Sequence, residues 1–385
     1  MKRTLIFLTH EFFPFRGGVA TYVKELAEAT QSIGYDVEVW TNGSPLSALN
    51  FSVPYPIRYV GGRAGILKLL SRLAFLDYIY KHREQLNEAF PVYSSYGALF
   101  CGMLLSGLRL GTPKEYGIIL HGSELLKVEK NPFLRYFCCR FFKNAAFVAS
   151  TSNHILDRLK ESCLGSEVKN TAVVPCAPPE ELAHANSNHT VDRDKITILT
   201  LARIHKRKGQ IEKAQALGKL PPEIRKKILW EIAGTGRTEE YLNQVLKVCR
   251  EMVVPYQLIG EVSDEQLADV YSRADIYVMS SRSLARSIEG FGITYLEAGL
   301  FEVPVVGYRT GGVEEAVIHG KTGILIDEGN VEALSKSLKR LILDPEERNR
   351  LGKAGREHAL QFTWEKSAKK LCDAAGRSLI KEAVS

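Results

Sequence analysis

Two carboxylates, Glu289 and Glu297, stand eight positions apart in the segment Glu289-Gly-Phe-Gly-Ile-Thr-Tyr-Leu-Glu297. The β-branched and aromatic run 275–280 before them predicts a strand, and residues 293–300 predict a buried helix. The turn between them would present free backbone N–H groups at a helix N-terminus, where a phosphate can bind. Eight helical residues rise about 12 Å, comparable to the reach of a nucleotide diphosphate sugar. Carboxylates suit its vicinal hydroxyls because they are acceptor-only groups.

A second group of candidate functional residues is basic and lies in the segment Leu201-Ala-Arg203-Ile-His-Lys-Arg-Lys208-Gly209. The apolar run from residue 196 predicts a buried strand that delivers Arg203 to its carboxyl end, where ligands gather in open α/β sheets. Lys208 then stands just before the next helix, with Gly209 allowing close backbone approach. Two fixed cations there can neutralise a leaving diphosphate as its charge develops. A solvated basic loop is the alternative interpretation.

Four further loops follow predicted strands, and each is a weak signal by itself. The first strand leads to Gly17 and Gly18, which let backbone amides contact a phosphate or a sugar. His121, in the segment His121-Gly-Ser-Glu124, ends an apolar strand. A Gly-x-Gly turn ends at Gly236, and Gly260-Glu261-Val262 follows another strand. A tight turn or a structural histidine would also explain these features.

Together these motifs occur in the order and spacing of a known family. The sequence resembles glycosyltransferase family 4, the group 1 glycosyltransferases, which are retaining enzymes with a GT-B fold. Glu289 and Glu297 match its E-x7-E motif, and Arg203 with Lys208 matches its R-x4-K-G signature. The resemblance spans nearly the whole chain. It is nearest to members like the phosphatidylinositol mannosyltransferases, because similar arginine-bearing loops precede the motif in them.

The resemblance implies a role for each matching position. The implied catalytic residues are Glu289, which approaches the donor sugar, Arg203 and Lys208, which clamp the diphosphate, and His121, which lines the sugar pocket. The implied donor-binding residues are Gly17, Gly18, Gly236, Gly260, Glu261, Val262, Gly290, Phe291, Gly292, Ile293 and Glu297, and the last of these binds the ribose. We expect no cofactor, because the nucleotide sugar is a substrate, and we expect no metal.

Length and patterning predict two α/β domains. At 385 residues the chain exceeds one ordinary core, and short apolar runs alternate with longer amphipathic ones, which indicates parallel sheets. We expect a GT-B architecture of two Rossmann-like domains facing across a cleft. Residues 1–178 would form the acceptor-side domain, 179–194 a linker, and 195–363 the nucleotide-sugar domain. The resemblance implies that a terminal helix over about 364–385 packs back on the first domain.

Composition indicates a globular protein with a basic N-terminal half. The net charge is +7, and residues 1–178 hold 20 Lys and Arg against 14 Asp and Glu. No basic-aromatic nucleic-acid motif is present, so an anionic acceptor or membrane face is the expected partner. Seven cysteines without a C-x-x-C pair favour a reduced, cytoplasmic setting and no zinc. Asp192-Arg-Asp194 spells a metal motif of another fold but lies in the predicted linker, where we expect a solvated turn.

Two segments bear on membranes. The first apolar run stops at Thr9, too short for a secretory segment, so we expect a buried strand there and no bilayer-spanning run elsewhere. The segment 65–80 has an apolar face, and between residues 58 and 83 six Lys and Arg accompany Asp77 alone. This segment is either an interfacial helix on anionic lipid or an ordinary helix of the first domain.

The resemblance therefore implies a metal-independent, retaining glycosyltransferase. It would move a hexosyl unit from GDP-mannose or a UDP-sugar to a glycan or lipid-linked acceptor, in the cytoplasm or peripherally at the inner face of a membrane. A sugar phosphorylase, a nucleotide-sugar epimerase or a non-catalytic nucleotide-sugar-binding protein are the alternatives on this fold. A Rossmann oxidoreductase is disfavoured because no G-x-G-x-x-G with a later acidic residue follows the first strand.

Overall fold

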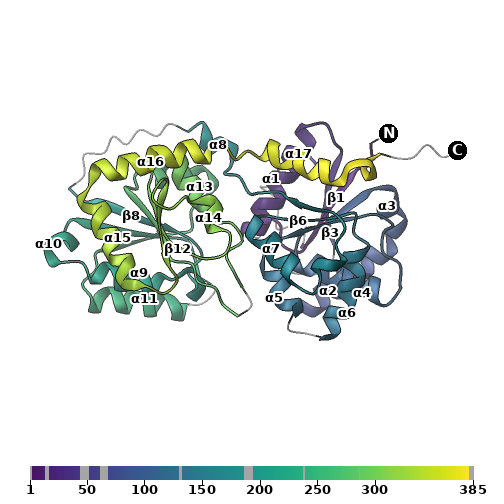
Figure 1. Cartoon of the computed structure of the whole chain (residues 1–385), viewed down its shortest axis with the longest axis horizontal. Helices are drawn as coiled ribbons and strands as arrows, with labels where there is room; N and C mark the ends of the chain where they lie inside the picture. Colours follow the sequence, from purple (N-terminus) through teal and green to yellow (C-terminus); the bar gives the residue numbers. More distant parts are fainter. Residues whose placement is uncertain are drawn as a thin grey trace. The chain divides into compact units, whose positions relative to one another are not determined.

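The structure is a computed structural model that describes residues 2–13, 17–43, 52–60, 68–129, 132–185, 194–236, 239–285 and 287–380. The chain divides into two compact units (Figure 1). One unit comprises residues 1–176 together with 364–385, and the other comprises residues 177–363. Each is a Rossmann-like unit with a wholly parallel sheet and helices around it, as the sequence predicts.

The first unit is built on seven parallel strands in the order β3-β2-β1-β4-β5-β6-β7. Their bounds are β1 Leu5–Thr9, β2 Val37–Asn42, β3 Ile57–Val60, β4 Phe90–Tyr93, β5 Gly117–Leu120, β6 Phe147–Ser150 and β7 Thr171–Val173. Every residue of β1, β4, β5 and β6 is buried. Central parallel strands are covered on both faces, so they consist of nearly continuous apolar runs.

Helices surround this sheet in the first unit (Figure 1). They are α1 Gly18–Ser32, α2 Lys68–Lys81, α3 Arg83–Glu88, α4 Tyr96–Gly107, α5 Ser123–Glu129, α6 Pro132–Lys143, α7 Asn153–Glu161 and α17 Trp364–Ala375, with 3-10 turns η2 Gly165–Glu167 and η5 Gly376–Leu379. Although α17 comes last in the sequence, it packs against α1. The hydroxyl of Ser367 on α17 donates to the carbonyl oxygen of Pro175 at 2.8 Å.

The second unit has six parallel strands in the order β10-β9-β8-β11-β12-β13. The strands are β8 Ile196–Leu201, β9 Ile228–Ala233, β10 Tyr256–Gly260, β11 Ile276–Met279, β12 Val305–Arg309 and β13 Gly323–Asp327. The helices are α8 Glu180–Ala183, α9 Gln210–Gly218, α10 Pro222–Arg225, α11 Glu239–Glu251, α12 Leu267–Ser272, α13 Ile293–Leu300, α14 Val313–Ala316, α15 Val331–Leu343 and α16 Pro345–Ala359, with 3-10 turns η3 Lys206–Lys208 and η4 Asp264–Gln266. One apolar cluster around Trp230, Ile276 and Leu338 forms its core.

The strand order fixes where a ligand can bind in the second unit. The chain runs outward in one direction from β8 through β9 to β10 and then returns to the centre, so β8 and β11 are neighbours. Open parallel sheets bind ligands outside the carboxyl ends of the strands at such a reversal point. The loops that follow β8 and β11 are the loops that hold Lys208 and Glu289.

The predicted strands and the helix 293–300 are confirmed, with small shifts at their ends. The strand predicted over 275–280 runs over Ile276–Met279, for example. The prediction omitted β3, a half-exposed strand at the sheet edge. The helix expected over 65–80 is observed as Lys68–Lys81, while residues 65–67 lie outside the described residues.

Candidate functional site

The turn after β8 presents two basic side chains to the carboxyl end of the sheet. Its 3-10 helix η3 covers Lys206–Lys208, and the backbone N–H of Lys208 donates to the carbonyl of His205 at 2.7 Å. Gly209 then joins η3 to α9 with φ of 67°, in the left-handed region. A Cβ on Gly209 would lie 2.2 Å from the carbonyl oxygen of Ser280, so glycine is required there on both counts.

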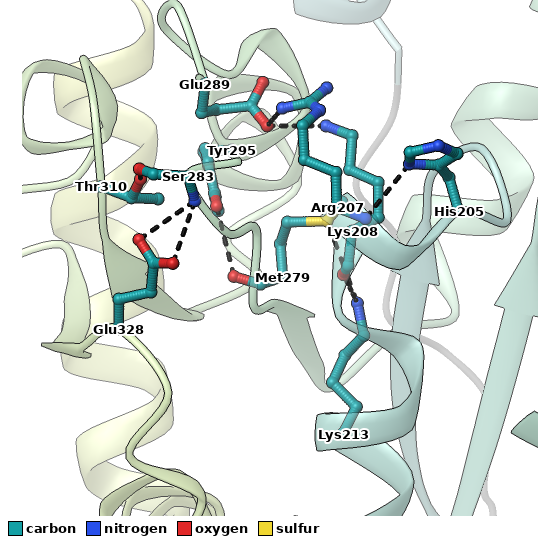
Figure 2. A network of polar contacts seen from close by, with 10 residues as sticks. All are labelled: His205, Arg207, Lys208, Lys213, Met279, Ser283, Glu289, Tyr295, Thr310 and Glu328. Carbon is teal, nitrogen blue, oxygen red and sulfur yellow. Dashed lines mark hydrogen bonds and ion pairs between the residues drawn. The ribbon is translucent and has the colours of Figure 1, made fainter. Parts of the chain in front are cut away.

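Glu289 lies between the two basic side chains of this turn. One carboxylate oxygen, Oε2, accepts from Lys208 Nζ at 2.7 Å and from a guanidinium nitrogen of Arg207 at 2.8 Å (Figure 2). All three side chains are nearly buried, with exposed fractions of 11–15%. Buried charges are stable in a protein only when they are paired and hydrogen-bonded, as these are.

The pKa values of this ion pair reflect burial and charge together. Burial alone would raise the pKa of Glu289, but the neighbouring cations Lys208 and Arg207 outweigh it and hold that pKa well below its usual range. Burial lowers the pKa of Lys208, and Glu289 offsets part of that shift while Arg207 and Arg203 add to it. Glu289 is therefore an ionised acceptor at neutral pH.

The backbone of Glu289 is fixed by two glycines that follow β12. The N–H of Gly312 donates to the Glu289 carbonyl at 3.1 Å. Gly311 has φ of 58°, and a Cβ there would come within 2.0 Å of the same carbonyl oxygen. This close approach of two backbone segments determines the position of the carboxylate.

Glu297 lies on α13, which begins at Ile293 after Gly292. Gly292 has φ of 92°, and a Cβ there would clash with the ring of Tyr295 at 2.4 Å. Glu297 is 6% exposed, and its Oε2 accepts from the hydroxyl of Tyr271 at 2.6 Å. Burial, followed by the charge of Glu297, raises the pKa of Tyr271, so this phenol is a hydrogen-bond donor.

Arg203 occupies a different position from that of Lys208. It is exposed, its carbonyl accepts from the Gln210 side chain at 3.0 Å, and its charge acts on Lys208. The cation that pairs with Glu289 beside Lys208 is Arg207, which the sequence analysis did not select. The sequence signal that could have identified Arg207 is its position beside Lys208 in the basic run Lys206-Arg207-Lys208. The Tyr271 contact of Glu297 had no sequence signal, because the two residues are far apart in the chain.

The predicted base-binding loops lie at the same end of the sheet. Gly236 pairs with Ile204 in a parallel bridge, which brings its loop beside the turn after β8. Gly260 has φ of 79°, and its carbonyl accepts from the N–H of Gly234 at 2.6 Å. The next residues, Glu261 and Val262, are exposed and half-buried, respectively. In the motif around α13, Phe291 is 2% exposed and Gly290 is half-buried.

The remaining predicted residues, His121, Gly17 and Gly18, belong to the first unit. His121 Nε2 is 2.9 Å from the Ser94 carbonyl oxygen, and the backbone N–H of His121 donates to the Glu124 carboxylate at 3.0 Å. Its ring meets the ring of Tyr22 edge-on at 4.9 Å. Gly17 precedes α1 and Gly18 is its first residue, exposed, with open space where a Cβ would be. These contacts fix the histidine ring and leave the glycine backbone accessible.

The part of the chain that the structure describes contains no group of three or more His, Cys, Asp or Glu suited to a metal ion. Within those same residues, no helix has the length and apolar character needed to cross a membrane. Asp192 of the D-x-D sequence lies outside the described residues. The expectation of a metal-free reaction stays a prediction.

Comparison with known proteins assigns this fold to a class. Over 97% of this chain and 98% of the other, the structure matches sucrose-phosphate synthase from Thermosynechococcus elongatus with a TM-score of 0.81 and 20% identity. This similarity shows the GT-B fold. Residues 184–358 match the family model described as Glycosyl transferases group 1. This match confirms the resemblance to the group 1 glycosyltransferases that the motifs predicted.

Two curated relatives narrow the comparison. The chain is 31% identical over 188 residues to a GDP-mannose-dependent alpha-(1-6)-phosphatidylinositol monomannoside mannosyltransferase of Mycolicibacterium smegmatis. These residues make up 47% of this chain and 47% of the relative. The aligned part therefore spans about half the length of that relative. It is 27% identical to a D-inositol 3-phosphate glycosyltransferase of Pseudarthrobacter chlorophenolicus, over 91% of this chain and 88% of the relative.

Proposed function

We propose that the chain is a retaining, metal-independent glycosyltransferase that moves a hexosyl unit from a nucleotide-diphosphate sugar to a lipid-linked or inositol-containing acceptor. The observation that carries this proposal is the buried carboxylate of Glu289 paired with Lys208 and Arg207 at the reversal point of the second sheet. The relatives named above are a GDP-mannose-dependent enzyme of a phosphatidylinositol mannoside and a glycosyltransferase of D-inositol 3-phosphate. These names favour GDP-mannose as the donor over a UDP-sugar.

In the proposed reaction, the bond between C1 of the sugar and the leaving phosphate oxygen breaks. The acceptor oxygen bonds to C1 on the same face, and its proton passes to the leaving phosphate. Lys208 and Arg207 neutralise the charge that develops on the diphosphate, and such fixed charges are worth most where water is excluded. The ionised Glu289 accepts hydrogen bonds from the donor sugar, while Glu297 receives the ribose hydroxyls.

The test uses the full-length protein with GDP-mannose and UDP-glucose as donors and phosphatidylinositol, inositol 3-phosphate and inorganic phosphate as acceptors. We expect transfer from GDP-mannose to an inositol-containing acceptor, unchanged by EDTA, with the α configuration of the donor kept in the product by NMR. A sugar phosphate as the main product would indicate a phosphorylase, and an isomerised donor an epimerase. Donor binding without any turnover would refute a catalytic role.

We also propose that α2 brings the protein to the surface of an anionic membrane. Leu70 and Leu73 on this helix are 55% and 46% exposed, and their spacing of three positions places them on one helix face. Arg72 lies over the rings of Tyr96 and Phe100, at 5.5 and 5.7 Å. Leu70→Glu with Leu73→Glu should abolish sedimentation with phosphatidylglycerol vesicles; undiminished sedimentation would remove this proposal. Lys68 is a further candidate contact, but its side chain lies outside the described residues.

A further inference from the structure

Lys213 on α9 is a lysine whose side chain is completely buried. Its Nζ donates to the carbonyl oxygen of Lys208 at 2.8 Å and lies 3.9 Å from the sulfur of Met279 (Figure 2). No carboxylate bonds to this ammonium group in the described residues. Burial lowers the pKa of Lys213 to about 7, with a further lowering by Lys208 and a partial offset by Glu212. A leucine or methionine would fill this site at much lower cost.

The bond from Lys213 completes a set that immobilises the turn after β8. Three successive carbonyl groups, those of residues 207, 208 and 209, each receive a separate donor. The carbonyl of Arg207 accepts from the backbone N–H of Arg282 at 2.7 Å, and the carbonyl of Gly209 accepts from the hydroxyl of Ser280 at 2.8 Å. Lys213 supplies the side-chain donor to the middle carbonyl. The carbonyl it holds belongs to the residue whose ammonium bonds to Glu289.

We propose that Lys213 is a positioning residue, which fixes the backbone of Lys208 so that the Lys208 ammonium group meets the leaving diphosphate. This inference rests on the proposed function and goes beyond it by adding a lysine that contacts no substrate. An amine donates to a carbonyl whether charged or neutral. The contact is therefore retained when Lys213 loses its proton near neutral pH.

Misplacing a catalytic group by about 1 Å costs roughly 10²-fold in rate. We therefore expect Lys213→Met, which keeps the chain length and removes the donor, to lower kcat about 10- to 100-fold with a smaller change in the donor KM. If Lys213 acts through Lys208, the same substitution made in a Lys208→Ala background should change kcat by less than about twofold. If Lys213 acts independently of Lys208, the two effects on kcat should multiply in the double variant, so a double-mutant cycle distinguishes the two cases.

The experiment measures kcat and KM for Lys213→Met, Lys208→Ala and the double variant, with thermal unfolding as a check of folding. Lys219→Met is the matched control, because Lys219 lies at the end of the same helix in an exposed ion pair with Glu332 at 3.0 Å. It should turn over normally. Ser280→Ala, which removes the donor to the adjacent carbonyl, keeps the test available should Lys213→Met not fold, and should show the same dependence on Lys208.

The inference is overturned if Lys213→Met has a normal kcat, or if its loss is equally large with and without Lys208. Equal losses would mean that Lys213 supports the core and not the clamp. With Ser280→Ala in its place, independence from Lys208 has the same meaning. A wild-type protein without turnover on any donor would overturn the proposed function and this inference together. An active wild type that is insensitive to these changes overturns the positioning role alone.

Discussion

The change Glu289→Gln removes a negative charge from between two nearly buried cations. In the wild type, Oε2 of Glu289 is 2.7 Å from Lys208 Nζ and 2.8 Å from the Arg207 guanidinium. Removing one partner of a buried ion pair costs about 3–5 kcal/mol, because the other charges stay buried without compensation. For a unit of this size, such a loss lowers the unfolding temperature by roughly 6–20 °C. Turnover should also fall, because the acceptor for the sugar hydroxyls is lost.

The same variant should bind a nucleoside diphosphate more tightly than the wild type. In the wild type, Glu289 competes with the ligand phosphates for Lys208 and Arg207, and in the variant it does not. A tenfold gain in affinity adds about 1.4 kcal/mol of ligand stabilisation at one saturating concentration. The rise in unfolding temperature on adding GDP or UDP should therefore be larger for Glu289→Gln than for the wild type.

Thermal unfolding with and without GDP and UDP, together with titration calorimetry, measures both effects. Glu231→Gln is the matched control, since Glu231 is buried in β9 of the same unit and pairs with Arg273, a residue outside the turn after β8, at 2.9 Å. It should lose stability without any gain in diphosphate affinity. Equal or weaker diphosphate binding by Glu289→Gln would refute the reasoning that this carboxylate holds the phosphate-binding cations.

Acid pH gives an independent test of the same carboxylate. The pKa of Glu289 is held well below its usual range in the folded protein, whereas in the unfolded chain it is about 4.3. The unfolded state therefore binds more protons as the pH falls below that value, and the stability that Glu289 contributes is progressively lost. The stability difference between wild type and Glu289→Gln should narrow between pH 5 and pH 3 in urea unfolding. A constant difference would contradict the depressed pKa.

Three further predictions concern the surroundings of this ion pair. Lys208→Ala should lower kcat about 10²-fold or more, as the loss of one transition-state donor does, whereas Lys206→Ala in the same turn, with an exposed side chain, should be nearly normal in the same assay. Gly209→Ala should lower the free energy of unfolding in urea by more than the roughly 1 kcal/mol expected of the control Gly329→Ala. Both glycines have positive φ, but only at Gly209 would a Cβ also clash with a neighbouring residue. Equal losses in the two variants would contradict the close approach at Gly209. Tyr271→Phe should cost about 1–3 kcal/mol and raise the KM for the sugar donor, because it removes the hydrogen bond from the Tyr271 hydroxyl to the Glu297 carboxylate; an unchanged KM would show that Glu297 does not contact the sugar donor.

Local patterns in the sequence were sufficient to predict the frame of the site. The strand ending at Leu201 and the helix 293–300 are apolar runs whose boundaries are set by nearby glycines and charged residues. The prediction omitted β3 because only four residues form it, three of them half-buried at the sheet edge. A short edge strand of this kind has neither a continuous apolar run nor a clean alternation.

The choice of partners within the site could not be predicted in the same way. Glu289 pairs with Arg207 and Lys208, which are more than 80 positions earlier in the chain. Which of several neighbouring basic residues reaches the carboxylate depends on how η3 turns, and that turn is fixed by contacts from α9 and from the loop after β11. The burial of Lys213 could not be predicted from the sequence, because a lysine in the first turns of a helix is usually exposed.

The charges around Glu289 explain why a carboxylate is placed on the cations meant for phosphate. Burial lowers the pKa of Lys208, and the nearby cations Arg207 and Arg203 lower it further. The single carboxylate of Glu289 opposes this lowering and favours the charged form of Lys208, without neutralising the group of three cations. The remaining positive charge is available to a diphosphate, which brings more than one negative charge. The ion pair thus keeps the cations charged and in position before the donor binds, so that little reorganisation is needed when the leaving group develops its charge.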